Sequence, residues 1–248
     1  MRRGGLRVAC AGTGALLVSL LLPLISPQMA RANGAFPSSG QIVIDPTDDA
    51  RVGIRATYGL VVTLDAGNTF HWTCENALGY TGASHPQLGV TTSGTVFGGL
   101  LDGMIRGRLG ACEWPRVASL EGLAVVDVSF APSTGRAIAA VMPTPEGRGE
   151  VWSSDDDATT WSKVGASLPV KFRPLTLDAS PADPDRLYVS GLVDGSQIRG
   201  AVAHSEDGGE TWTLSFVPDA DASKAPYIGG VDPVDPDVLW VRLDAAPG

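Results

Sequence analysis

The apolar residues of this chain occur in short runs, and from Gln41 onward no stretch keeps a 3.6-residue period for the length of a helix. Aliphatic and β-branched residues instead form strand-length groups that are separated by Gly, Pro, Asp and Ser. Examples are residues 41–45, 60–63, 137–141, 186–190 and 238–242. Such runs predict β-strands, and many short strands at regular spacing predict a sandwich, a barrel or a propeller.

An octapeptide that recurs along the chain distinguishes between these architectures. Its pattern is Ser/Thr-x-Asp-x-Gly-x-Thr-aromatic, with complete copies at 63–70 and 205–212, a copy at 154–161 in which Ala replaces Gly, and a degenerate copy at 109–114. The residues that define the three recognisable copies are Thr63, Asp65, Gly67, Thr69 and Phe70; Ser154, Asp156, Thr160 and Trp161; and Ser205, Asp207, Gly209, Thr211 and Trp212. The closing aromatics, with Trp114 from the degenerate copy, are 44, 47 and 51 residues apart.

A second element also recurs along the chain. It contains Pro, usually after Asp, and stands at 43–46, 130–132, 178–184 and 231–236, each time followed by a strand-like run. A repeat of about 45 residues with four short strands has the size of one propeller blade. The sequence therefore predicts an all-β propeller of four-stranded blades at approximately 41–80, 85–120, 123–168 and 171–218. A partial blade at 226–248 makes about four and a half blades, and the predicted ring is incomplete.

The composition of the octapeptide has a local physical reason. The Asp carboxylate and the Ser/Thr hydroxyl accept hydrogen bonds from nearby backbone N–H groups in a turn, Gly adopts a positive φ without a Cβ clash, and the aromatic residue buries apolar area. The pattern resembles the Asp-box (BNR) repeats of sialidase-like propellers, sortilin-like receptors, xyloglucanase-like hydrolases and Ycf48-type assembly factors. The resemblance covers residues 41–248. It implies a structural turn away from the ligand site, and so no catalytic role for Asp65, Asp156 or Asp207.

The first 32 residues have the features of a secretory signal peptide. Three arginines lie within residues 1–7, an apolar run spans 11–25, and Ala30-Arg31-Ala32 places small residues at −3 and −1 of a cut after Ala32. A membrane span needs about 20 apolar residues, whereas this run is shorter and contains Pro23. We expect a bacterial protein that is secreted or periplasmic and starts at Asn33, with residues 33–40 as a linker.

Two cysteines, Cys74 and Cys112, remain after removal of the signal peptide. They stand near matching ends of successive predicted blades, and the compartment is oxidising. A disulfide between them is the simplest expectation. The alternative is two separately buried thiols, and the absence of C-x-x-C spacing disfavours a redox-active pair.

Charge restricts the partners of the mature chain. All 27 acidic residues and 14 of the 18 basic residues follow Arg31, which leaves 13 excess negative charges. Binding through phosphates requires a surplus of Lys and Arg. Nucleic acid is therefore excluded as an expected partner, and so is a membrane surface once the signal peptide has been removed.

No catalytic constellation stands out. The arginine motif that sialidases carry near the chain start is absent, and Phe172-Arg173-Pro174 is an incomplete match at the wrong place. A glycosidase needs two carboxylates about 5–9 Å apart, and Asp127, Asp178 and Asp232 could face a central cleft. The pattern favours solvated turn carboxylates at all three positions.

The sequence predicts no cofactor and no metal. The three histidines, His71, His85 and His204, are scattered and form no H-E-x-x-H motif. A structural Ca²⁺ is the alternative for the oxygen-rich loops at 155–157 and 45–49. Neither loop follows the EF-hand pattern, so turn capping and solubility explain them more simply.

Two functions from different classes remain. The first is an exported, non-enzymatic propeller that binds a protein or glycan on one face of the ring, which a partner or missing C-terminal blades would complete. The second is a fragment of a sialidase-like or xyloglucanase-like glycoside hydrolase that lacks part of its catalytic blades. Trp72, Trp114, Trp161 and Trp212 lie at or beside octapeptides, which assigns them to packing, whereas Trp152 and Trp240 are free to bind a ligand. Two facing carboxylates with an aromatic platform in the central cleft would favour the hydrolase.

Overall fold

The computed structural model describes residues 38–80, 85–142 and 148–244. The predicted signal peptide and its cleavage site at Ala32 lie outside these ranges. Within them, the chain forms antiparallel β-sheets and one short 3-10 helix, Ala118–Leu120. None of the described residues belongs to a helix with the length and apolarity that crossing a bilayer requires.

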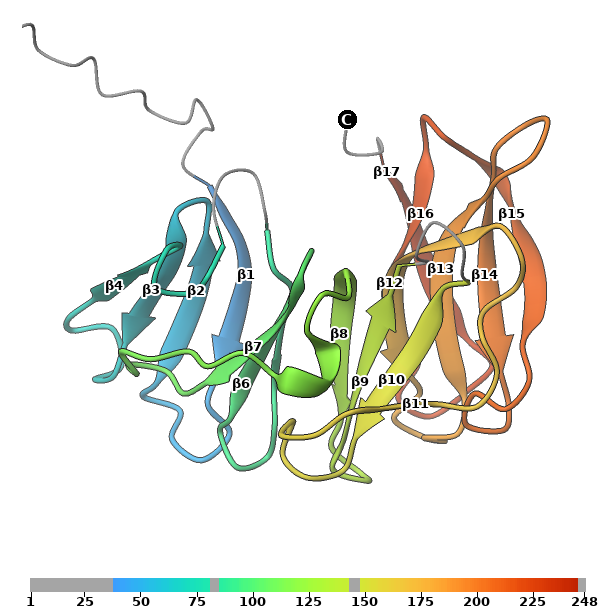
Figure 1. Cartoon of the computed structure of the whole chain (residues 1–248). Helices are drawn as coiled ribbons and strands as arrows, with labels where there is room; N and C mark the ends of the chain where they lie inside the picture. Colours follow the sequence, from blue (N-terminus) through green and yellow to red (C-terminus); the bar gives the residue numbers. More distant parts are fainter. Residues whose placement is uncertain (1–37, 81–84, 143–147, 245–248) are drawn as a thin grey trace, which may run out of the picture. The chain divides into compact units, whose positions relative to one another are not determined.

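Five sheets follow one another along the chain, as the colours in Figure 1 show. Sheet 1 contains β1 (Ser39–Ile44), β2 (Val52–Ala56), β3 (Gly59–Thr63) and β4 (His71–Cys74). Sheet 2 contains β5 (Leu88–Val90), β6 (Val96–Leu100) and β7 (Gly103–Gly107). Sheet 3 contains β8 (Val125–Ala131), β9 (Arg136–Val141), β10 (Glu150–Ser154) and β11 (Ser162–Lys163). Sheet 4 contains β12 (Phe172–Ala179), β13 (Leu187–Val193), β14 (Arg199–Ser205) and β15 (Thr213–Asp221), and sheet 5 contains β16 (Ala225–Val231) and β17 (Leu239–Asp244).

These sheets confirm the predicted fold class, a β-propeller of blades with up to four strands. Sheet 2 has three strands because its octapeptide is the degenerate one. The degenerate copy lacks the Ser/Thr and Asp of the pattern; its segment turns at 108–111, where the Ala111 N–H donates to the Arg108 carbonyl, but a single bridge between Ile105 and Arg116 takes the place of a fourth strand.

A separate apolar cluster joins each sheet to the next. Leu60 and Val62 of sheet 1 pack with Val96 and Ile105 of sheet 2. The equivalent clusters between later sheets contain Phe97 and Val128, then Val151 and Leu177, then Val202 and Val231. Sheets 2, 3 and 4 therefore bury apolar side chains on both faces, because successive side chains along a strand point to opposite faces of the sheet.

The first strands of consecutive sheets lie side by side and are joined through side chains. Gln41 on β1 donates to the Leu88 carbonyl at 2.7 Å and accepts from the Leu88 N–H at 2.9 Å. Thr176 on β12 accepts from the Ile228 N–H on β16 at 2.8 Å. These bridges satisfy backbone groups that face another sheet, which buried polar groups require.

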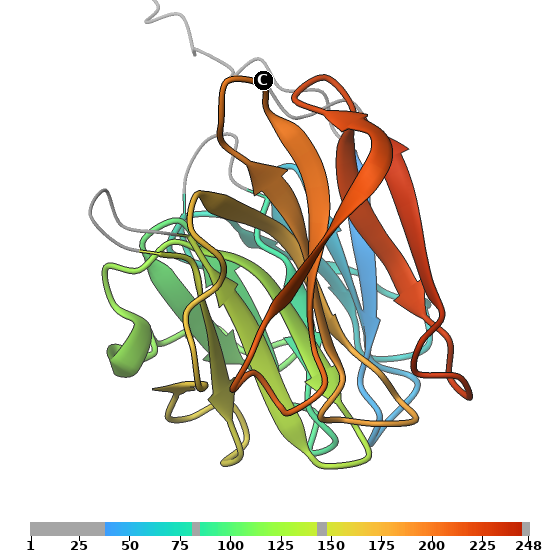
Figure 2. The same ribbon diagram turned by 90° about the vertical axis from the view of Figure 1, so that its right-hand side faces the viewer.

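Sheet 5 does not close the ring. In the described residues β17 pairs only with β16, and no hydrogen-bonded pairing connects sheet 5 to sheet 1. Figure 2 shows β16 and β17, in red, alongside the orange strands of sheet 4.

Candidate functional site

In all three recognisable octapeptides the Asp carboxylate accepts hydrogen bonds from the first hydroxyl and from the N–H and hydroxyl of the later Thr. In residues 205–212 the Ser205 hydroxyl donates to Asp207 Oδ1 at 2.7 Å and accepts from the Gly209 N–H at 2.8 Å. The Thr211 N–H donates to Asp207 Oδ1 at 2.9 Å, and its hydroxyl donates to Oδ2 at 2.6 Å. These donors, of which the Thr211 hydroxyl is the strongest, hold the pKa of Asp207 at about 2. Both carboxylate oxygens of Asp207 thus accept hydrogen bonds within the turn.

The closing aromatics pack against the preceding sheet. Trp161 of sheet 3 is 5% exposed and lies 5.7 Å from the Phe97 ring of sheet 2. Trp212 of sheet 4 donates its indole N–H to the Ala166 carbonyl, in the segment after sheet 3. The predicted packing role is wrong for Phe70 and Trp72, which are 55% and 64% exposed. They belong to sheet 1, which has no preceding sheet among the described residues.

The predicted disulfide is absent from the structure. Cys74 and Cys112 are free thiols that line the same cavity of about 490 Å³ between sheets 1 and 2. Two cysteines can line one cavity without being placed to form a disulfide. A disulfide needs Cα atoms about 4.4–6.8 Å apart and Cβ atoms directed at each other. The sequence spacing placed the two residues in one region, but it contains no information on that geometry.

The oxygen-rich loop at 155–157 joins sheets 3 and 2. Asp157 accepts hydrogen bonds from three hydroxyls of the 91–95 segment, with Ser93 at 2.7 Å and Thr95 at 2.6 Å. Arg106 lies 3.6 Å from the same carboxylate. Protein donors thus surround Asp157, and the described residues contain no group of three or more His, Cys, Asp or Glu suited to a metal ion.

A polar cavity of about 420 Å³ lies where the first strands of the sheets meet, and we call it the hub cavity. Its walls come from β1, β8, β12 and β16, together with Gln87 and with side chains of β2 and β17. Its charged lining residues are Arg55, Asp127, Asp178 and Arg242. Cations and carboxylates from four strands thus converge on one space, which the sequence pattern of any single strand does not reveal.

Asp127 and Asp178 are half-buried, so the expectation of solvated turn carboxylates is wrong for both. Asp127 Oδ2 accepts from the Leu177 N–H at 2.7 Å, and Asp178 Oδ1 accepts from the Ser129 hydroxyl at 2.9 Å. Burial, with a smaller contribution from the neighbouring Asp178, raises the pKa of Asp127 to about 7 despite the backbone donors, which lower it. Burial also raises the pKa of Asp178. Asp232, in contrast, caps a surface turn through the Val234 N–H.

Arg55 supplies a buried positive charge at the edge of this cavity. Arg55 is 8% exposed, and its Nε has no hydrogen-bond partner among the described residues. No carboxylate within the described residues forms an ion pair with it, and burial lowers its pKa. The guanidinium lies over Gly40, where a Cβ would stand 2.4 Å from Nη2. A buried cation without a partner is costly, so an anionic group that enters the cavity would be stabilised there.

Sequence reasoning missed Arg55 entirely. The pattern of the run 52–56 gives no signal for it: apolar residues stand at Val52, Ile54 and Ala56, so alternation assigns Arg55 to the outward, polar face, whereas the structure buries it. The histidines do not converge: His85 lines a smaller cavity beside Arg55, and His71 and His204 line two others.

Comparisons with known proteins support the fold. No protein-family model matches the sequence, and no curated protein matches it. An ancestral GH74 enzyme has a TM-score of 0.62 at 21% identity and covers 88% of this chain and 29% of its own. The GH74 xyloglucanase from Xanthomonas campestris has a TM-score of 0.61 at 18% identity over 84% of this chain and 36% of its own.

A third neighbour belongs to another functional class. YCF48, solved bound to D1 peptide, has a TM-score of 0.53 at 18% identity and covers 89% of this chain and 64% of its own. The present chain therefore spans less than two thirds of the length of each of these neighbours. At 18–21% identity these neighbours show that the fold is a β-propeller, and the function has to be argued from the site.

Proposed function

We propose that the mature chain is an exported, non-enzymatic β-propeller that binds a protein or glycan ligand in the hub cavity, on one face of the ring. The observation that carries the proposal is Arg55, a buried cation that lacks a partner within the described residues and faces a polar cavity. An acidic group of the ligand would pair with Arg55. Asp127 and Asp178 would accept hydrogen bonds from ligand N–H or hydroxyl groups.

Binding accounts for the two hub carboxylates better than catalysis does. Each accepts a hydrogen bond that joins β8 to β12, so each has a structural task. Among the described residues Tyr227 is the one aromatic residue that lines the hub cavity, and Arg242 lies over its ring at 5.8 Å. An aromatic platform for a sugar is thus incomplete. YCF48, a neighbour of the same fold, was solved with a bound peptide, which supports a protein-binding role.

The test compares wild type with Arg55→Gln on a glycan array and on a peptide library with free carboxyl termini. We expect wild type to select ligands that contain a carboxylate, and Arg55→Gln to lose at least about tenfold in affinity, as removal of a charged hydrogen bond predicts. Arg51→Gln is the matched control because Arg51 forms a surface pair with Asp48 in the loop between β1 and β2, next to the strand that carries Arg55. Equal binding by Arg55→Gln would contradict the proposal.

A glycoside hydrolase fragment, sialidase-like or xyloglucanase-like, is the second candidate. The raised pKa of Asp127, to about 7, favours it because a general acid must be protonated near neutral pH. Release of reducing sugar from xyloglucan, or of fluorophore from a sialic-acid glycoside, would be measured for wild type, Asp127→Asn and Asp178→Asn. Turnover by wild type that both variants abolish would replace the binding proposal.

Export is tested by intact mass. The protein recovered from the periplasm or medium of an expressing bacterium should begin at Asn33. Retention of residues 1–32 would show that the first segment is not cleaved, and would remove the basis for a secreted or periplasmic location.

A further inference from the structure

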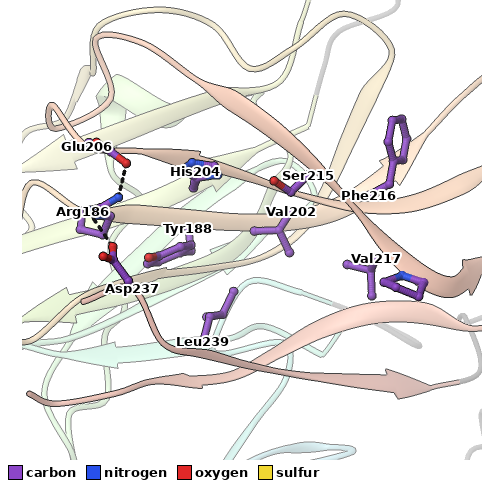
Figure 3. A pocket seen from close by; sticks show the side chains of 11 residues that line it. Arg186, Tyr188, Val202, His204, Glu206, Ser215, Phe216, Val217, Asp237 and Leu239 are labelled. Carbon is purple, nitrogen blue, oxygen red and sulfur yellow. Dashed lines mark hydrogen bonds and ion pairs between the residues drawn. The ribbon is translucent and has the colours of Figure 1, made fainter. Parts of the chain in front are cut away.

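Two arginines that lie between sheets have different charged surroundings. Arg186, directly before β13, borders a cavity of about 490 Å³ between sheets 4 and 5, where it pairs with Glu206 and, at 2.8 Å, with Asp237 (Figure 3). Arg55 forms no ion pair within the described residues, and its Nε has no hydrogen-bond partner there. Carboxylates of the chain itself thus compensate Arg186, whereas Arg55 has no such partner.

The hub cavity nevertheless contains carboxylates. Asp127 and Asp178 line the same space of about 420 Å³ as Arg55, but neither forms an ion pair with it. Arg242, the other cation of the lining, pairs with Asp244 at 2.9 Å. The cavity therefore holds a cation and a pair of carboxyl groups apart from each other. Such an arrangement is complementary to a ligand that carries charges of both signs.

The two aspartates form a pair across neighbouring strands. The Leu177 N–H of β12 donates to Asp127 of β8, and the Ser129 hydroxyl of β8 donates to Asp178 of β12. Sheets 3 and 4, which contain these strands, each have a neighbouring sheet on both sides, so the placement of the pair does not depend on how the ring closes. Two carboxylates that share a poorly solvated site repel each other, and a bound cation removes this repulsion.

The chemistry of the pair favours an organic cation. In the described part of the chain no third His, Cys, Asp or Glu joins Asp127 and Asp178 in a group suited to a metal ion. The described hydrogen bonds of Asp178 both go to Oδ1, which leaves Oδ2 as an acceptor toward the cavity. Ammonium and guanidinium groups donate several hydrogen bonds and form strong ones with carboxylates. Lysine and arginine side chains supply these groups in peptides, which also contain carboxylates.

We propose that the hub ligand is a peptide segment that carries both signs of charge, with a carboxylate on Arg55 and a lysine or arginine side chain on Asp127 and Asp178. This inference rests on the proposed function, because it names the ligand class of the same cavity. It adds a requirement that capture of a carboxylate by Arg55 does not have: the ligand must also present a cation.

The experiment measures binding of short N-acetylated glycine peptides that have a free carboxyl terminus and one lysine at, or one or two positions before, the last residue. Each peptide has a counterpart in which norleucine replaces lysine and removes only the ammonium group. A second counterpart has an amidated C-terminus and lacks only the carboxylate. We expect the best lysine peptide to bind at least about tenfold more tightly than either counterpart, because each loses a charged hydrogen bond.

The pH dependence of affinity should have opposite signs for the lysine and norleucine peptides. Burial raises the pKa of Asp127 to about 7, and it also raises the pKa of Asp178. The remaining titratable or charged lining groups are Arg55, Tyr227 and Arg242. From about pH 5.5 to 8 loss of the aspartate proton should strengthen binding of the ammonium group and weaken binding of a carboxylate alone. Asp127→Asn should flatten both trends.

Variants of the protein assign each charge of the peptide to its site. Asp178→Asn should abolish the preference for lysine over norleucine, and Arg55→Gln should abolish the preference for a free over an amidated terminus. Asp232→Asn is the matched control, because Asp232 caps a surface turn outside the cavity. The comparison of peptides on wild type remains decisive if a variant does not fold.

The possible failures differ in what they overturn. Equal affinity for the lysine and norleucine peptides, with binding still dependent on Arg55, would overturn the requirement for a cation and leave the proposed function intact. A preference for lysine that survives in both Asp127→Asn and Asp178→Asn would also overturn the present inference. Binding that Arg55→Gln does not weaken, or no binding by any peptide at millimolar concentration, would overturn both proposals for peptide ligands.

Discussion

The octapeptides at 63–70 and 154–161 are two copies of one turn in different surroundings. Asp65 accepts from the Thr69 N–H at 2.8 Å and from its hydroxyl at 2.6 Å, and Asp156 accepts from Thr160 at the same two distances. Yet Phe70 is exposed whereas Trp161 is buried against sheet 2. The turn is therefore specified locally by its own side chains, and burial of its aromatic depends on whether another sheet precedes it.

Truncation of the aromatics should give the largest difference between the two copies. We expect Trp161→Ala to cost about 3–5 kcal/mol in the free energy of unfolding, the range for large buried aromatics. Phe70→Ala should cost less than about 1 kcal/mol because its ring is already largely in water. Urea denaturation of both variants measures this. Similar losses would mean that the exposed face of sheet 1 is covered in solution.

Removal of the turn carboxylates should instead affect both copies alike. Asp156→Ala should lower stability by about 1–2 kcal/mol, as loss of a capping side chain does, and Asp65→Ala should lower the melting temperature by a matching amount. Asp155→Ala is the control, since Asp155 forms only an exposed pair with Arg136. A much smaller effect at Asp65 would show that the turn also needs the neighbouring sheet.

The pH dependence of stability should separate turn carboxylates from hub carboxylates. Hydrogen-bond donors hold the pKa of Asp65, Asp156 and Asp207 at about 2, below the ordinary 3.8, so their contribution is complete above about pH 4 and is lost as the pH falls toward 2. Burial raises the pKa of Asp127 to about 7, so its contribution is complete below about pH 4 and is lost as the pH rises through 7.

Melting temperatures between pH 2 and 8 measure both effects. We expect a maximum near pH 4–5 and a decline toward pH 8. Asp127→Asn should flatten the decline and leave the acid limb unchanged, because the amide cannot ionise. An unaltered decline would show that Asp127 is not buried as the structure has it.

The local sequence pattern predicted those features of the molecule that depend on residues close together in the sequence. The strands and the turns around Asp65, Asp156 and Asp207 follow from alternation and from side chains within eight residues of each other. The hub cavity could not be predicted in this way, because Arg55, Asp127 and Asp178 lie on three different sheets and are brought together only by the packing of the repeats. For the same reason the spacing of Cys74 and Cys112 brought them to one cavity without determining a bond.

The smallest expected effect comes from replacing the glycine of the turn. This replacement separates the cost of backbone strain from the cost of packing. Gly67 and Gly209 have φ values of +88° and +99°. A Cβ at Gly67 would meet only the Phe70 ring, at 3.9 Å, whereas at Gly209 it would meet Val164 of the preceding repeat at 2.8 Å. Gly67→Ala should therefore cost about 1 kcal/mol, the cost of a left-handed alanine, and Gly209→Ala should cost more because Val164 must also move.

Ala158 already occupies the equivalent position at +58°, so the turn tolerates a Cβ where the neighbouring sheet leaves room. Urea denaturation of the two glycine variants gives the difference directly. Equal costs would mean that the gap beside sheet 1 is filled in solution, and that its turn is packed like the others.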